Sequence, residues 1–131
     1  LNDFELIKQI GKGGFARVFL VRRIKTGETY AMKVINVAEK QNKKFQNIEN
    51  LKKEKKVLDM LRGDFVVKAV FTFLHEQFIC FIMEYLMGGD FAHTIEERGC
   101  LEDYEAKFYI AEVVLAVEYL HSLGIIHRDL K

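Results

Sequence analysis

The chain has 131 residues, of which 50% are hydrophobic and 30% are charged, and its formal net charge is +1. This composition predicts a globular chain with a hydrophobic core, and the nearly neutral charge gives no reason to expect nucleic acid as a partner. No apolar run reaches the roughly 18 residues of a membrane-spanning helix. Cys80 and Cys100 are too few for a disulfide framework, so we expect a reducing cytoplasmic setting, or a nuclear one.

Residues 11–18 read GKGGFARV, a glycine-rich stretch of the kind that holds phosphates in several unrelated folds. The stretch lacks the G-K-[ST] ending of a P-loop, but GKGGFA matches the G-x-G-x-x-G/A pattern of dinucleotide-binding units. Such a unit needs a helix after the glycines, whereas in protein kinases the loop joins two antiparallel strands. Residues 17–35 are rich in β-branched and aromatic side chains around a KTGE turn, which indicates strands. The pattern therefore disfavours a dinucleotide-binding oxidoreductase, which stays a distant alternative.

Hydrophobic periodicity predicts five strands and three helices along the chain. The strands are expected at residues 4–10, 18–23, 29–36, 65–74 and 77–83. The helices are expected at residues 41–62, from the N-cap Asp90 to Gly99, and at 102–123. The last helix is apolar on nearly all sides, which predicts a buried core helix.

The order of these elements predicts an α+β fold. Five strands with one helix inserted after the third would form a small, mostly antiparallel sheet lobe over residues 1–86. The remaining helices would begin a helical lobe over residues 87–131. The inserted helix would pack on the sheet through one apolar stripe, which comprises Phe45, Ile48, Leu51, Leu58 and Leu61.

Two charged residues, Lys33 and Glu54, occupy positions that should face the core. Lys33 shares a strand face with Ala31 and Ile35, and Glu54 lies on the apolar stripe of the inserted helix. A buried charge is costly unless it is paired, so an ion pair between strand and helix would satisfy both groups. The alternative is that Glu54 lies at the rim of its helix beside neighbouring lysines.

Five segments, taken in order, resemble the first half of a eukaryotic protein kinase domain: GKGGFARV, YAMK, LKKEKKVL, IMEYLMGGD and YLHSLGIIHRDLK. The resemblance covers essentially all 131 residues and implies transfer of the γ-phosphate of ATP, with Mg²⁺, to protein hydroxyls. Lys131, two residues after Asp129, is the form found in Ser/Thr kinases. YAMK and MEYLMGGD resemble the AGC branch, the last helix resembles its microtubule-associated and Greatwall-like group, and the glycine loop resembles that of polo-like kinases.

The resemblance also implies roles for individual residues. Lys33 would hold the α- and β-phosphates and pair with Glu54, Asp129 would orient the attacking hydroxyl and accept its proton, and Lys131 would contact the transferred phosphate. His127 and Arg128 would organise the catalytic loop. Besides Lys33, the residues that would bind ATP are Ile10, Gly11, Lys12, Gly13, Gly14, Phe15, Val18, Ala31, Met83, Glu84, Leu86 and Asp90.

In the resembled family the metal ligands are an Asn five residues after the catalytic Asp and the Asp of an Asp-Phe-Gly motif. Both positions lie beyond Lys131, so no metal ligand is expected within this chain. The sequence thus predicts the N-terminal half of a catalytic domain, inactive by itself, with apolar surface exposed on its last helix.

The expected partners are a protein substrate, with basic residues near the phosphorylated site that could meet Asp90, and an upstream activating kinase. Control by phosphorylation follows from Arg128, which in this family commonly contacts phosphates on the activation segment. A pseudokinase, which would be a nucleotide-binding or scaffolding module without transfer, is the main alternative. The presence of Lys33, Glu54 and Asp129 argues against it.

Overall fold

The computed structural model describes residues 1–13, 16–36 and 44–130. Within the chain, two compact units are distinguished. The first comprises Leu1–Leu61 and Val67–Tyr85, and the second comprises Arg62–Val66 and Leu86–Lys131. Each unit has its own secondary structure and its own packing.

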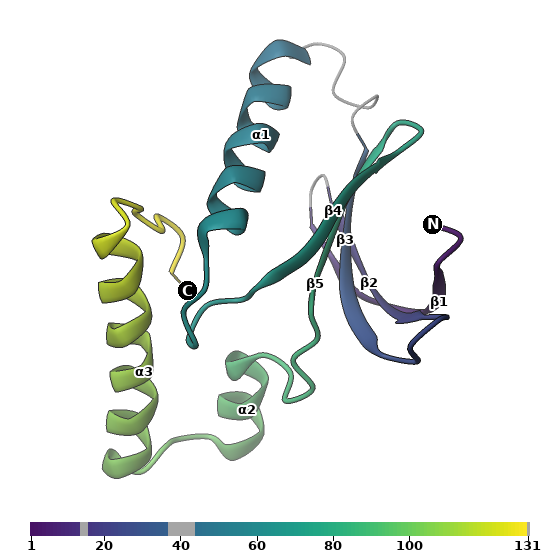
Figure 1. The fold of residues 1–131 in the computed structure, drawn as a ribbon. Coiled ribbons are helices and arrows are strands. Elements are labelled where there is room, and N and C mark those ends of the chain that lie inside the picture. The colour runs from purple at the N-terminus through teal and green to yellow at the C-terminus, as the bar shows by residue number, and fades with distance from the viewer. Residues whose placement is uncertain (14–15, 37–43, 131) are drawn as a thin grey trace. The chain divides into compact units, whose positions relative to one another are not determined.

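The first unit contains a five-stranded sheet in which all neighbouring strands are antiparallel. The strands follow one another in the sheet in the order β1-β2-β3-β5-β4 (Figure 1). Their bounds are β1 Phe4–Lys12, β2 Ala16–Arg23, β3 Thr29–Asn36, β4 Ala69–His75 and β5 Phe78–Glu84. The predicted antiparallel sheet is therefore confirmed.

The fourth strand begins four residues later than the sequence predicts, at Ala69 instead of Phe65. Its partner β5 ends at Glu84, whose N–H donates to the carbonyl of Lys68 at 3.2 Å. Residues before Lys68 have no facing strand to bond with, so their β-branched and aromatic side chains do not produce a strand.

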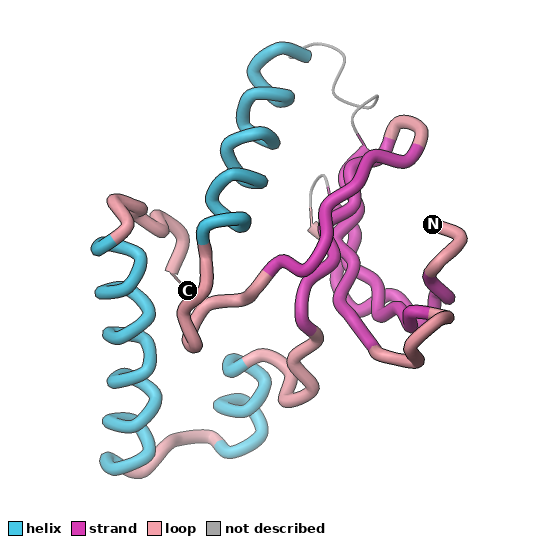
Figure 2. Tube along the Cα trace, in the orientation of Figure 1, coloured by secondary structure: helices cyan, strands magenta, loops and turns pink. Residues whose placement is uncertain are grey.

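The two faces of the sheet carry separate hydrophobic clusters. One cluster has Val21, Met32, Cys80 and Ile82 at its centre, all at most 1% exposed. The other joins Ile35 and Phe81 of the sheet to Leu51 of α1 (Lys44–Met60). Figure 2 shows this helix beside the sheet, and the predicted stripe therefore packs as expected at the positions that the structure describes, Leu51, Leu58 and Leu61. The side chains of Phe45 and Ile48 lie outside the description.

The second unit contains α2 (Phe91–Arg98) and α3 (Asp103–Ser122). Asp90 is the N-cap of α2, as predicted, because its Oδ1 accepts a hydrogen bond from the N–H of His93 at 2.9 Å. Gly99 ends this helix with φ 78°, a conformation that favours glycine. At the start of α3, Oε2 of Glu105 accepts from the N–H of Glu102 at 3.0 Å.

The prediction that the last helix is a buried core helix is wrong for this structure. Leu120 is its one buried residue among those described, whereas Phe108 and Ile110 are each 61% exposed. Inside the second unit, the ring of Phe91 of α2 contacts the ring of Tyr109, with centroids 4.4 Å apart and an angle of 48° between the ring planes. The predicted exposed apolar surface on α3 is therefore present. No helix in the described ranges combines the length and the apolar character needed to cross a membrane.

Residues 62–66 group with the helical unit, although the sequence analysis assigned them to the sheet lobe. The N–H of Arg62 donates to the hydroxyl of Tyr119 on α3 at 2.7 Å. Gly63 lies against the same ring, where a Cβ atom would be 2.7 Å from Cδ1 of Tyr119. The hydrogen bond joins two residues that are 57 positions apart in sequence. Together with the contact at Gly63, it holds residues 62–66 on α3.

Candidate functional site

The glycine-rich stretch joins β1 to β2, so it is followed by a strand and not by a helix. Gly11 lies opposite Val18, and a Cβ atom at Gly11 would be 3.4 Å from Cβ of Val18. The N–H of Gly13 donates to the carbonyl of Ala16 at 2.8 Å, which closes the hairpin. Since a dinucleotide-binding unit needs a helix at this point, that alternative is wrong.

The remaining residues predicted at this hairpin fall into two groups. Ile10 and Lys12 belong to β1, and both side chains are exposed. Gly14 and Phe15 lie outside the described residues, as does Lys131. The part of the hairpin that is described has glycine where strands approach closely, which leaves backbone groups accessible to a ligand.

Lys33 and Glu54 form the expected ion pair, with 2.6 Å between Nζ and Oε1. Lys33 lies in the middle of β3 opposite Val18, and Glu54 comes from α1 one turn after the buried Leu51. The two side chains are 31% and 35% exposed, so the pair is partly open to solvent. The strand and the packed helix together hold an ammonium group at a defined place beside the glycine hairpin.

The residues expected around the adenine share one face of the sheet with Lys33. Ala31 is 9% exposed and lies opposite Met83 of β5, and Met83 packs against the cluster of Ile35, Leu51 and Phe81. Alternation along β2 places Val18 on this face as well. The arrangement presents an apolar surface next to a fixed cation, which suits a ligand with an aromatic ring and an anionic group.

Glu84 uses both its backbone and its side chain within the sheet unit. Its N–H donates to the carbonyl of Lys68, and its Oε1 accepts from the N–H of Lys68 at 2.8 Å. The resemblance to protein kinases implies that Glu84 binds ATP, and this pairing with Lys68 takes up its backbone N–H. No pattern in the sequence pointed to Lys68, because the contact spans 16 positions.

The second unit holds the other predicted site residues. Leu86 is 58% exposed, and Asp90 is exposed with one carboxylate oxygen engaged in capping α2. Asp129 follows Arg128, whose φ of 64° is in the left-handed region that non-glycine residues rarely adopt. The N–H of Asp129 donates to Nδ1 of His127 at 3.3 Å. The left-handed conformation of Arg128 and the hydrogen bond from Asp129 to His127 therefore define the backbone conformation next to Asp129.

This left-handed residue is a feature that the sequence analysis missed. The residue type does not predict a positive φ angle, because Arg has a Cβ atom and favours ordinary strand or helix conformations. Holding such a residue costs about 1 kcal/mol, and such conformations cluster at functional sites. The unusual backbone conformation of Arg128 thus marks the segment next to Asp129 as a candidate functional site.

Among the described residues, no three His, Cys, Asp or Glu side chains are grouped so that they could hold a metal ion. The Mg²⁺ ligands that the resemblance implies are Asn and Asp side chains beyond Lys131. The described residues of the candidate site supply an ammonium group, apolar surface and a carboxylate.

Comparison with known proteins agrees with this geometry. The protein kinase domain family matches residues 4–131. The chain is 44% identical over 131 residues to "Probable serine/threonine protein kinase IRE" of Arabidopsis thaliana, and 44% identical over 131 residues to "Protein kinase 3" of Dictyostelium discoideum. It is 38% identical over 131 residues to "Serine/threonine-protein kinase sax-1" of Caenorhabditis elegans.

Each of these alignments covers 100% of the chain but only part of the relative. The chain spans 11% of the Arabidopsis protein, 14% of the Dictyostelium protein and 27% of the Caenorhabditis protein. The match to the family nevertheless extends over almost every residue, including the glycine hairpin, the Lys33–Glu54 pair and the segment before Asp129. The chain belongs to the protein kinase domain family.

Proposed function

We propose that the protein carrying this chain is a Ser/Thr protein kinase that transfers the γ-phosphate of ATP to Ser or Thr hydroxyls of other proteins. The observation that carries the proposal is the ion pair between Lys33 and Glu54, with 2.6 Å between Nζ and Oε1. Phosphoryl transfer depends mainly on positioning and on charge stabilisation, so it needs a cation that stays in one place. A strand lysine held by a helix carboxylate meets that need.

In this proposal Lys33 neutralises oxygens of the α- and β-phosphates. Gly11 and Gly13 leave room for backbone N–H groups to approach phosphate oxygens, while Val18 and Ala31 pack on the adenine ring. When bound, Mg²⁺ would neutralise charge on the phosphates, and its ligands would come from residues after Lys131.

Asp129 accepts the proton of the substrate hydroxyl as the oxygen of that hydroxyl bonds to phosphorus and the bond to the ADP oxygen breaks. The left-handed conformation of Arg128 and the hydrogen bond from the N–H of Asp129 to His127 support this role because they hold the backbone that carries the carboxylate. Lys131, two residues further on, would contact the transferred phosphate and favours Ser and Thr over Tyr as acceptors.

The finer assignment within the proposal is an AGC-like kinase, based on the segments YAMK and MEYLMGGD. A substrate with basic residues near its phosphorylated site would suit Asp90, and an upstream activating kinase would act through Arg128. We place the protein in the cytoplasm, with the nucleus as the other compartment, since Cys80 and Cys100 are both free thiols.

The test is phosphate transfer by the protein that carries this chain, with radiolabelled ATP, Mg²⁺ and three peptides that differ only in having Ser, Thr or Tyr. We expect label on Ser and Thr and none on Tyr. Asp129→Asn should remove most of kcat, by about a hundredfold or more, and leave ATP affinity nearly unchanged. Asp3→Asn is the matched control, because Asp3 is exposed in the turn before β1, and it should retain full activity.

Transfer at the wild-type rate by Asp129→Asn would show that the assigned base is wrong. A pseudokinase would give a third result. The protein would bind ATP, with an affinity that depends on Lys33, but neither the wild-type protein nor any variant would label a peptide.

A further inference from the structure

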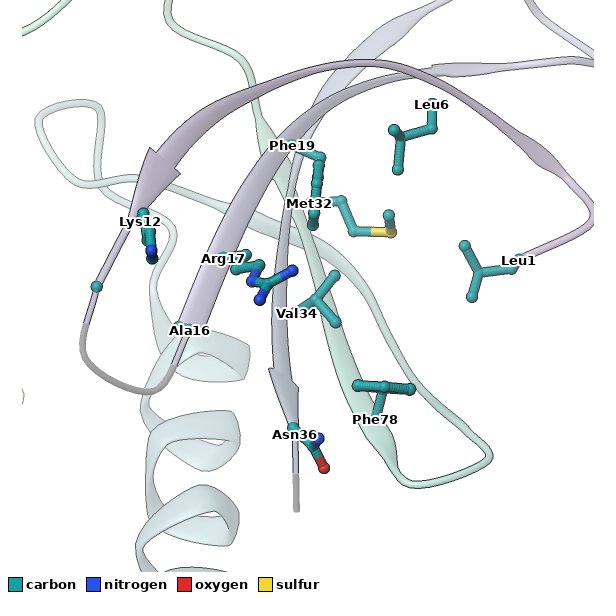
Figure 3. Close-up of a pocket in the computed structure, with 11 residues that line it drawn as sticks. Leu1, Leu6, Lys12, Ala16, Arg17, Phe19, Met32, Val34, Asn36 and Phe78 are labelled. Atoms are coloured by element: carbon teal, nitrogen blue, oxygen red, sulfur yellow. The ribbon is translucent and has the colours of Figure 1, made fainter. Parts of the chain in front are cut away.

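The first unit has a pocket of about 450 Å³ on the face of the sheet opposite Lys33. Met32 and Val34 contribute to it from β3, and these residues alternate with Lys33, whose side chain points to the other face. Phe19 of β2 and Phe78 of β5 complete its apolar floor (Figure 3). The sheet therefore separates this pocket from the Lys33–Glu54 pair.

The polar part of the pocket is cationic. Lys12 and Arg17 line it where the glycine hairpin turns, and Figure 3 shows the Arg17 guanidinium extending toward Val34. No Asp or Glu lines the pocket in the described part of the chain. Neither cation forms an ion pair with any residue described, although several other exposed cations do, such as Arg22 with Glu5. The pocket thus pairs an apolar floor with two cations that have no counter-ion among the residues the structure describes.

The size and the shape of the charge decide which ligand fits. A volume of about 450 Å³ lies within the roughly 300–1,000 Å³ typical of small-molecule sites, whereas protein partners bury far larger and flatter surfaces. An apolar floor with two cations at one end matches a molecule with an apolar body and one anionic end. A neutral molecule would offer no counter-charge to the two cations, and a polyanion would place negative charge against the apolar side chains of Phe19 and Met32.

We propose that this outer-face pocket binds a small organic anion, a carboxylate on an aromatic or aliphatic body, with the body on Phe19, Met32, Val34 and Phe78 and the carboxylate near Arg17 and Lys12. The site lies on the opposite face from Lys33, Val18 and Ala31, although Lys12 and Gly13 at its hairpin end also belong to the stretch assigned to ATP. The proposal goes beyond kinase activity. Both cations are solvent-exposed, so each contributes a modest share of the affinity.

The test uses 1-naphthaleneacetate and its neutral isostere 1-naphthaleneacetamide, titrated into the protein that carries this chain and followed by calorimetry. Mg²⁺ and a non-hydrolysable ATP analogue are present throughout, so that the probes do not report the nucleotide site of a kinase. If the kinase assignment fails, the analogue is simply inert and the outer-face result stands alone. The anion and the amide can each adsorb on the exposed apolar side of α3. This adsorption is common to the two probes and cancels when their binding is compared.

We expect the anion to bind more tightly than the amide and to lose affinity as salt rises. Arg17→Ala should weaken the anion by about threefold to fivefold and leave the amide nearly unchanged. Lys8→Ala is the matched control: it removes one exposed positive charge from β1, and Lys8 does not line the pocket. It should leave both isotherms unchanged.

Equal affinity for anion and amide, or equal effects of Arg17→Ala and Lys8→Ala, would overturn the proposal. So would the absence of any Arg17-dependent binding, which is the result expected if another part of the protein or a second copy fills the pocket. Val34→Trp, which fills the floor without removing either positive charge, provides an independent check and should weaken anion and amide binding at this site together.

Discussion

Nζ of Lys33 lies 2.6 Å from Oε1 of Glu54, and this contact joins β3 to α1 across 21 residues of sequence. The helix is held on the sheet by Leu51 against Ile35 and Phe81, so the position of Glu54 is set by apolar packing and not by the ion pair itself. Glu54 therefore acts as a positioning residue for the Lys33 ammonium.

Glu54→Gln should lower kcat for phosphate transfer by at least about tenfold, because the neutral amide no longer holds the ammonium in place. The free energy of unfolding should fall by about 1 kcal/mol or less, since both side chains are about one-third exposed. Steady-state kinetics and urea unfolding check the two effects. Lys33→Met should abolish most transfer, because it removes the cation itself.

Glu49→Gln is the control for the Glu54 variant, since it makes the same change at an exposed site on the same helix. It should leave kcat and stability unchanged. Unaltered kinetics in both Glu54→Gln and Lys33→Met would contradict the role assigned to the ion pair.

Gly63→Ala should lower the free energy of unfolding by about 1–3 kcal/mol, because the new methyl group would lie 2.7 Å from a ring carbon of Tyr119. Gly88→Ala is the matched control: nothing lies within 4 Å of its added Cβ, and it should change stability by no more than about 0.5 kcal/mol. A double-mutant cycle by urea unfolding completes the test. The cost of Gly63→Ala should shrink in a Tyr119→Ala background, and an unchanged cost would show that the ring is not the obstacle.

Cys100 should react with a thiol reagent at pH 8 within minutes, and Cys80 only when the protein unfolds. Cys100 is exposed, whereas Cys80 is 0% exposed in the outer-face core, and this burial raises the pKa of the Cys80 thiol. Both effects lower the accessible thiolate at Cys80. Peptide mapping by mass spectrometry after labelling distinguishes the two sites, and Cys100→Ser should remove the fast signal. Equal labelling rates in the folded protein would mean that the sheet opens readily.

Lowering the pH should destabilise the start of α3, because the Glu105 carboxylate becomes protonated. The N–H of Glu102, and after it the Arg98 guanidinium at 2.7 Å, hold the pKa of the Glu105 carboxyl below its usual value. Because the folded pKa lies below the unfolded one, ionised Glu105 stabilises the fold above the unfolded pKa of about 4.3. That contribution is lost as the pH falls through the folded pKa.

Urea unfolding between about pH 2 and pH 6 measures this effect. Glu105→Gln should flatten the dependence of stability on pH over the acid range, and Glu118→Gln, which alters an exposed carboxylate in the same helix, should not. An unchanged acid profile in Glu105→Gln would show that the carboxyl does not titrate against these partners.

Local patterns in the sequence were enough to predict the strands and the N-cap at Asp90. Alternation along β2 and β3 decided that the glycines open a strand, since that signal is contained in neighbouring residues. The first residue of β4 could not be predicted in this way. Phe65–Lys68 has the composition of a strand, and it is excluded only because β5 ends at Glu84 and offers no partner.

The sequence by itself indicated a pair of residues, because a lysine and a glutamate at expected core-facing positions favour pairing through the cost of burying charge. It left open a rim position for Glu54, and the tertiary structure decided for the pair. The sequence also determined the family, because the order of five motifs is a property of the chain alone. The tertiary structure decided the features that depend on distant residues, namely the fit of Gly63 against Tyr119, the use of the Glu84 N–H by Lys68, and the exposure of α3. The physical reason is that burial and close contact depend on what else occupies the space around a residue, and a local pattern records only what that residue could tolerate.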